Sequence, residues 1–209
     1  MIQNCYGQHK RPYVVLQTIR NKLEGEQLVS DASNQPEAAV LIPVTDQKIP
    51  RMVLTRRAAH LNKHAGEVAF PGGKKDPEDA SIIETALRES FEEIGLQPDE
   101  VEVIGRLPPA CSVFGLKVTP IVGIIHPDQN FIPNEEELDH IFTVPLSYFL
   151  ENEPSHIHRA SYKGMDFQVP SFNYNGNIIW GLTAYFIADF MNRIFDTSIS
   201  IQLRAPQNL

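Results

Sequence analysis

Three glutamates near the middle of the chain are the side chains best spaced to do chemistry. Glu89, Glu92 and Glu93 stand at positions i, i+3 and i+4, so on a helix they share one face. Three like charges on one face repel each other, which a purely structural helix has reason to avoid. Hard divalent cations such as Mg²⁺ or Mn²⁺ bind carboxylate oxygens and would relieve that repulsion. The spacing therefore predicts a helical metal site.

The neighbouring residues favour a metal site over a merely solvated acidic helix. Gly72 and Gly73 come before the helix, and glycine lets the backbone approach a metal or a phosphate closely. Arg88 stands at helical spacing from both Glu84 and Glu92, so it could pair with either and fix the orientation of the carboxylates. Three glutamates alone would be explained as surface charge; the glycines and the arginine together favour the metal.

The elements that must position these residues follow from local signals. A helix is predicted over Ala80–Ile94, and Gly95 is placed to end it. Two starts are open, an Asp76-Pro77 cap and a Ser81-x-x-Glu84 capping box. A second helix is predicted from Gly181 to about Ile194, and a short one over Val14–Leu23. Strands are predicted over Ala38–Val44, Met52–Thr55, Glu67–Phe70, Val101–Leu107 and Val118–Ile125. The mixture indicates an α/β or α+β layered domain.

Composition narrows the class of protein. The net charge of −8 argues against general nucleic-acid binding. Yet the segment 51–75 is basic against a single acid, Glu67, and acidic residues dominate from 76 to 102. This pattern suits a site for both phosphate and metal, but charge alone favours two solvated faces of opposite sign. No apolar run is long enough to span a bilayer. Cys5 and Cys111 lie far apart without a C-x-x-C pair, which indicates a soluble, cytoplasmic protein.

The segment that begins at Gly72 resembles the Nudix box, G-x5-E-x7-R-E-U-x-E-E-x-G-U. Its second half matches in spacing, through Arg88-Glu89, Glu92-Glu93 and Gly95-Leu96. Its first half departs from the pattern. One extra residue lies between Gly73 and Arg88, Asp79 stands where the isolated glutamate is expected, and Ser90 replaces an aliphatic residue.

The segment before the box narrows the resemblance. Residues 54–73, from Leu54-Thr55-Arg56-Arg57 to Phe70-Pro71-Gly72-Gly73, are similar to the motif that precedes the box in coenzyme A diphosphatases. That branch also tends to carry the extra box residue. Asn62 departs, since the branch usually has arginine there, although Lys63 is adjacent. The resemblance covers roughly residues 36–194 and implies an N-terminal leader (1–35), a Nudix hydrolase domain (36–195) and a C-terminal tail (196–209).

The resemblance implies a fold and a set of site residues. The fold is a mixed β-sheet sandwiched between α-helices, with the box as a loop–helix–loop at the site. The implied cofactor is Mg²⁺ or Mn²⁺, with Glu89 and Glu93 as principal ligands, Glu92 assisting and the Gly72 carbonyl as a further ligand. Among the catalytic residues, Arg88 orients the carboxylates, and Glu137 from the later acidic loop is a candidate ligand or base. The residues implied in binding substrate phosphate are Arg56, Arg57, Lys63 and Gly73.

The implied activity is hydrolysis of coenzyme A, or a derivative of it, to 3′,5′-ADP and 4′-phosphopantetheine. Two alternatives stay open: the same chemistry on ADP-ribose or a nucleoside triphosphate, and a Nudix-fold protein that binds nucleotides without catalysis. The expected partner is a small-molecule substrate, with neither nucleic acid nor membrane. Related proteins often dimerise, so a homodimer is the assembly to test.

Overall fold

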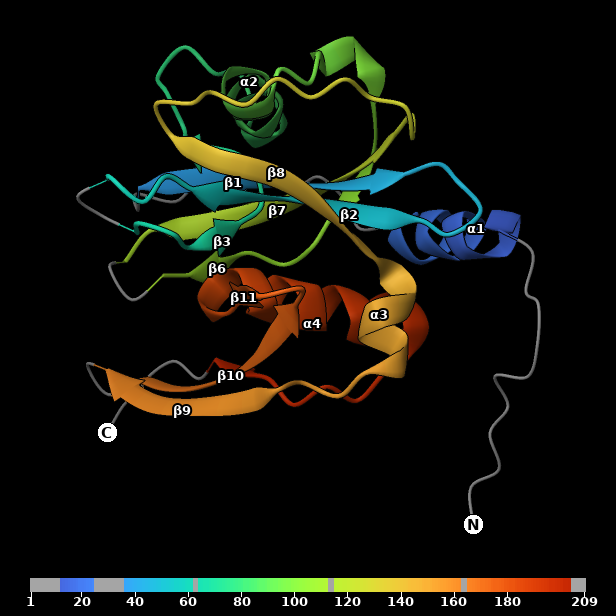
Figure 1. Cartoon of the computed structure of the whole chain (residues 1–209), viewed down its shortest axis with the longest axis vertical. Coiled ribbons are helices and arrows are strands. Elements are labelled where there is room, and N and C mark those ends of the chain that lie inside the picture. Colours follow the sequence, from blue (N-terminus) through green and yellow to red (C-terminus); the bar gives the residue numbers. More distant parts are fainter. Residues whose placement is uncertain (1–11, 25–35, 62–63, 113–114, 163–164, 204–209) are drawn as a thin grey trace.

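The chain folds around one large mixed β-sheet. The computed structural model describes residues 12–24, 36–61, 64–112, 115–162 and 165–203. In this sheet the strands follow the order β3-β2-β1-β7-β5, with β4 paired to β1, β6 to β7 and β8 to β2 (Figure 1). The strands are β1 (Glu37–Thr45), β2 (Arg51–Arg57), β3 (Val68–Ala69), β4 (Gly72–Lys74), β5 (Val101–Arg106), β6 (Ala110–Cys111), β7 (Lys117–Ile125) and β8 (Leu138–Pro145).

The two central strands explain why the sheet is mixed. β1 and β7 run parallel in an unbroken register from Glu37↔Lys117 to Thr45↔Ile125, whereas every other described pairing in the sheet is antiparallel. Both strands read as nearly continuous apolar runs, and nearly all of their residues are buried. Such runs are typical of strands covered on both faces.

Helices cover both faces of this sheet. Helix α2 (Ile82–Ile94) lies on one face and packs Ala86 and Ile94 against Leu41 and Ile121. The opposite face is covered by α1 (Pro12–Leu23), α3 (Leu146–Glu151) and α4 (Gly181–Phe195) (Figure 1). The sheet is thus sandwiched between helices, as predicted.

A second, smaller sheet packs around α4. Its strands follow the order β11-β10-β12, with β9 paired to β10; β9 lies on the far side of α4 from the main sheet, whereas β11 reaches β3 of the main sheet (Figure 1). These strands are β9 (His156–Tyr162), β10 (Met165–Tyr174), β11 (Asn177–Ile179) and β12 (Gln202–Leu203), and a 3₁₀ turn, η1 (Pro98–Glu100), precedes β5.

The predicted elements are present, and several others were not predicted. All three predicted helices and all five predicted strands form, with ends shifted by a few residues. Strand β8 and the strands after residue 150 were not predicted, because the burial of β8 alternates weakly and β9 carries mostly polar residues. α1 packs onto the domain through Leu23, which lies against Gly105, and through a two-bond ion pair of Arg20 with Glu102. The division at residues 35 and 195 stays a prediction.

No helix in the described ranges combines the length and the apolar character that crossing a membrane requires.

Candidate active site

Helix α2 starts at Ser81, which decides between the two predicted caps. The Ser81 hydroxyl accepts a hydrogen bond from the Glu84 N–H at 3.1 Å, and the Glu84 carboxylate accepts one from the Ala80 N–H at 2.7 Å. The arrangement differs from a strict capping box in that Glu84 reaches Ala80 rather than the cap itself. The helix ends at Gly95, which takes a left-handed φ of 70°.

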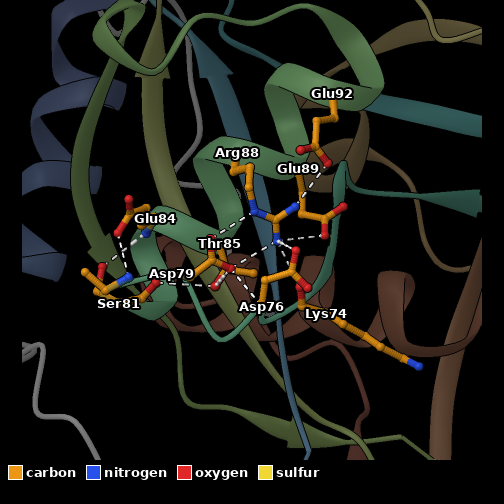
Figure 2. Close-up of polar contacts among 10 residues, drawn as sticks. Lys74, Asp76, Asp79, Ser81, Glu84, Thr85, Arg88, Glu89 and Glu92 are labelled. Carbon is orange, nitrogen blue, oxygen red and sulfur yellow. Dashed lines mark hydrogen bonds and ion pairs between the residues drawn. The ribbon is translucent and has the colours of Figure 1, made fainter.

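Arg88 is the centre of a polar cluster on α2 (Figure 2). Its guanidinium donates two hydrogen bonds to Asp79, at 2.9 and 3.0 Å. It also reaches Glu92 at 3.0 Å, Glu89 at 3.0 Å and the carbonyl of Lys74 at 3.1 Å. These contacts tie the helix to β4 and fix two of the three glutamates. Of the two predicted partners, Glu92 is the one that pairs with Arg88, while Glu84 caps the helix.

Asp79 has a structural role that the sequence left unassigned. It is buried and accepts further hydrogen bonds from the Thr85 hydroxyl and the Asp76 N–H, each at 2.9 Å. The Arg88 guanidinium is the main reason that the pKa of Asp79 falls far below its usual range, and Asp79 in turn raises the pKa of Arg88. Asp79 therefore holds Arg88 in place. Its position in the box, where an isolated glutamate is expected, was the available signal.

Glu89 lies directly against the second glycine of β4. A Cβ atom added to Gly73 would lie 2.4–2.5 Å from the carboxylate atoms of Glu89, so only a glycine leaves room for them. Gly72 is confined in a different way. Its φ is 154°, and an added Cβ would lie 2.2 Å from the Ala39 carbonyl oxygen of β1. The glycine pair thus lets β4 fit between β1 and α2.

Glu93 meets the same glycine pair from the next turn of the helix. Its Oε2 accepts a hydrogen bond from the Gly72 N–H at 3.1 Å, and its Oε1 lies 3.9 Å from Nη1 of Arg57. The carboxylate is nearly inaccessible, with 6% of the residue exposed. Glu89 and Glu93 therefore approach β4 side by side, with a cation from β2 beside them.

Burial shifts the protonation of both carboxyls. Burial raises the pKa of Glu93 to about 7, helped by the charges of Glu137 and Glu89 and opposed by the Gly72 N–H and by Arg57. Burial also raises the pKa of Glu89, although Arg88 opposes it. Two adjacent carboxylates whose charge is disfavoured form a site where a cation is stabilising.

Glu92 lies apart from this pair. Its side chain is 53% exposed and contacts Arg88 on the solvent side of the helix. Consistent with this, no three acidic, histidine or cysteine side chains within the described ranges converge in the manner of a preformed metal site. Two of the three predicted carboxylate ligands face a common point, and the third faces solvent.

The later acidic loop is attached to the end of α2. The Ile132 N–H donates to the Ile94 carbonyl and the Asn134 N–H donates to the Glu93 carbonyl, each at 2.9 Å. The Ala58 N–H binds the Glu137 carbonyl at 2.8 Å. Glu137 is half-buried and its charge acts on Glu93, whereas its neighbours Glu135 and Glu136 are exposed. Of the three, Glu137 is the residue that the fold brings to the site.

The two arginines at the end of β2 differ in their surroundings. Successive strand residues point to opposite faces, and Arg57 reaches Glu93 while Arg56 lies 3.6 Å from Asp139. Asp139 sits at an irregularity in the pairing of β2 with β8. The Nε atoms of both arginines are buried without a hydrogen-bond acceptor within the described part of the chain, so the ion-pair partners are what distinguish the two. Lys63, the third predicted phosphate contact, lies outside the described residues.

Comparison with known proteins agrees with this arrangement. The NUDIX domain family model matches residues 35–166. A protein of Enterobacter sp. (strain 638) called uncharacterized Nudix hydrolase NudL is 44% identical over 164 residues, which cover 78% of this chain and 85% of that protein. A protein of the same name from Salmonella paratyphi B is 43% identical over 175 residues, covering 84% and 91%.

A solved structure supports the fold. The crystal structure of a MutT/nudix family protein from Enterococcus faecalis superposes with a TM-score of 0.50 at 14% identity, covering 83% of this chain and 67% of that one. At that identity the likeness concerns the fold alone. The matched domain and the identity to the NudL proteins show more: the chain belongs to the Nudix hydrolase family.

Proposed function

We propose that the protein is a diphosphatase that hydrolyses coenzyme A, or a derivative of it, to 3′,5′-ADP and 4′-phosphopantetheine. The observation that carries the proposal is the approach of Glu89 and Glu93 to Gly72-Gly73, with Arg57 3.9 Å from Glu93. Carboxylates suited to a divalent cation and a guanidinium suited to phosphate thus lie together.

The choice of coenzyme A rests on the segment that leads into this site. Residues 54–73 resemble the motif of coenzyme A diphosphatases, and they contribute Arg57, Gly72 and Gly73 to the described geometry. His60 of this segment contacts the Glu136 carbonyl at 3.2 Å, so the segment is also attached to the loop that carries Glu137.

The donor set fits a divalent metal ion, which members of the family generally use. Glu89 and Glu93 would hold Mg²⁺ or Mn²⁺ together with the Gly72 carbonyl, and Glu92, which faces solvent and pairs with Arg88, would have to turn toward them to assist. When bound, such an ion neutralises charge on the diphosphate oxygens and activates a water molecule for attack on phosphorus. The fit rests on a buried carboxyl, Glu93, and a partly buried one, Glu89, whose pKa values are both raised by desolvation and which therefore gain from a nearby positive charge.

The protein's own groups have distinct roles in this proposal. Arg57 donates from its Nη atoms, which lie beside Glu93, to a phosphate oxygen, and the bare backbone of Gly73 lets the diphosphate approach. Arg88 positions Glu89 and Glu92 rather than contacting substrate, because its donors are engaged by protein acceptors. Glu137, half-buried at the edge of the site, accepts the proton from the attacking water.

Product analysis tests the proposal. Purified protein is incubated with coenzyme A, with and without Mg²⁺ or Mn²⁺, beside ADP-ribose and a nucleoside triphosphate. We expect metal-dependent release of 3′,5′-ADP, faster than turnover of the other compounds, and loss of most of that turnover in Glu93→Gln with the fold intact. Cleavage of another diphosphate alone would keep the chemistry and reject the substrate. Binding of nucleotides without any product would indicate a non-catalytic protein.

A further inference from the structure

A cavity of about 200 Å³ lies on the other side of β4 from the carboxylates. It is bounded by β1, β4 and β7 and by the first turn of α4, which contributes Leu182 and Thr183. The backbone of Gly72 and Gly73 forms part of its wall. The same two glycines contact Glu93 and Glu89 on the α2 side. The backbone of this glycine pair therefore lies between the cavity and the proposed diphosphate site.

The lining of the cavity is almost wholly apolar. Val40, Leu116 and Leu182 are partly exposed around it, and Ala38 and Val118 form its buried wall. Two lining residues, Thr183 and Lys74, have polar side chains, but neither offers a free polar group inside the cavity. The Thr183 hydroxyl donates to the Val68 carbonyl at 3.1 Å. Lys74 is exposed, and Figure 2 shows its side chain directed away from the Arg88 cluster.

These features do not suit a purine base. Recognition of a base needs a ring to stack on or free donors and acceptors for its edge. The two aromatic rings of the lining, Phe70 and Phe186, are 2% and 1% exposed, so neither offers an open face. Gly72 and Gly73 pair with Val40 and Ala39 of β1. The lining thus favours a compact apolar group.

The position of the cavity adds a second constraint. The backbone of Gly72 and Gly73 borders both the cavity and the carboxylates of Glu93 and Glu89, so a group joined to the phosphate by a short link suits the cavity better than one held off by a ribose. In the nucleoside half of coenzyme A, a ribose separates the base from the phosphate. In the pantetheine half, a single methylene joins the phosphate oxygen to a quaternary carbon that carries two methyl groups. That branched carbon meets both constraints.

We propose that this cavity receives the dimethyl-substituted carbon of the pantetheine arm and leaves the nucleoside half outside it. The inference rests on the proposed function, since it takes coenzyme A as the substrate. It assigns Leu182, Val40 and Leu116 to substrate specificity, because they form the partly exposed apolar surface that the methyl groups would contact.

The test fills the cavity. Leu182→Trp adds bulk at its mouth, and Leu150→Trp is the matched control on α3, where Leu150 is 41% exposed and outside the lining. For each protein we would measure kcat/KM for coenzyme A and the inhibition constants of 4′-phosphopantetheine and 3′,5′-ADP. We expect Leu182→Trp to lower kcat/KM by about ten-fold or more, as for other poorly fitted alkyl groups. It should weaken inhibition by 4′-phosphopantetheine while leaving that by 3′,5′-ADP unchanged.

Other outcomes have distinct meanings. Suppose that Leu182→Trp still cleaves coenzyme A but weakens inhibition by 3′,5′-ADP as much as inhibition by 4′-phosphopantetheine, or changes neither. Either result would overturn the inference while keeping the proposed function. Absence of coenzyme A cleavage in the wild type would reject both. If Leu182→Trp fails to fold by circular dichroism, Leu182→Ala replaces it. The wider cavity of this variant should weaken inhibition by 4′-phosphopantetheine but not inhibition by 3′,5′-ADP. An equal effect on inhibition by both products would again overturn the inference.

Discussion

The carboxylate of Glu93 lies between the N–H of Gly72, 3.1 Å from Oε2, and the guanidinium of Arg57, 3.9 Å from Oε1. Both neighbours favour the charged carboxylate, yet burial outweighs them and raises its pKa from 4.5 to about 7. The protein thus holds a carboxyl at a protonation midpoint near neutral pH, in contact with the glycine pair that the proposed diphosphate approaches.

This pKa makes a prediction about stability without metal. Between about pH 4.5 and pH 7 the folded protein retains a proton that the unfolded chain has released, so stability falls as pH rises through that window and then levels off. Glu93→Gln carries no such charge and should be more stable than wild type above pH 7, by up to about 3 kcal/mol, with no difference below about pH 4. Denaturant unfolding in a chelator across this range measures it.

Glu92→Gln is the control for that experiment. Glu92 is 53% exposed and is paired with Arg88 at the surface, where ion pairs contribute only about 0–1 kcal/mol. Its variant should follow the wild-type pH profile. A Glu93→Gln profile parallel to wild type from acid to alkaline pH would contradict the burial of charge at Glu93.

The glycine pair separates an effect on activity from an effect on folding. In Gly73→Ala the new methyl would meet the movable end of Glu89, at 2.4–2.5 Å, so the carboxylate must shift while the backbone stays. We expect kcat for coenzyme A to fall by about ten- to a hundred-fold with little change in stability, as small displacements of catalytic groups do. Steady-state kinetics and thermal unfolding measure the two effects.

Gly72→Ala is the matched variant. There the methyl would lie 2.2 Å from the Ala39 carbonyl oxygen, in a backbone conformation with φ of 154°. Neither feature relaxes without moving β4 from β1, so a loss of about 3 kcal/mol or more of stability is expected. If Gly72→Ala and Gly73→Ala unfolded with equal stability, the close packing of β4 against β1 at Gly72 would be contradicted.

The helix that carries the three glutamates could be predicted from the sequence because it depends on local periodicity. The i, i+3, i+4 spacing placed the three glutamates on one helix, and Gly95 ended it as predicted. Periodicity alone did not predict which of the three carboxylates contact β4 and which one faces solvent. Glu89 and Glu93 lie against β4, whereas Glu92 faces solvent and is paired with Arg88.

The long-range contacts were beyond the sequence alone. Asp79 is nine residues from Arg88, a spacing that no helical rule connects, because Asp79 lies in the loop before the Ser81 cap and outside the periodicity of the helix. The different surroundings of Arg56 and Arg57 likewise depend on the irregular pairing of β2 with β8, and β8 was not predicted. The resemblance to coenzyme A diphosphatases pointed to both arginines alike, and the contacts with Glu93 and Asp139 distinguish them.

The ion pair of Asp79 with Arg88 predicts loss of stability in acid. Its depressed pKa means that Asp79 stabilises the fold above the unfolded value of about 3.9 and loses that contribution as pH falls below it. Asp79→Asn should cost about 2–3 kcal/mol at neutral pH, less than for a fully buried pair because Arg88 is 25% exposed. Asp76→Asn, whose carboxylate is 58% exposed and 3.7 Å from Arg88, should cost little. Urea unfolding at neutral and acid pH compares them, and equal costs would refute the central role of Asp79.

The two arginines of β2 provide the sharpest test of phosphate binding. Arg57 lies 3.9 Å from the proposed metal ligand Glu93, whereas Arg56 lies 3.6 Å from Asp139, away from the carboxylate pair. A charged hydrogen bond contributes about 1.5–3 kcal/mol, so Arg57→Gln should lower kcat/KM for coenzyme A by about ten- to a hundred-fold. Arg56→Gln should change it less than about three-fold. Kinetics of both variants under the same metal concentration decide the matter: a larger loss for Arg56 than for Arg57 would mean that the diphosphate enters from the opposite face of the sheet.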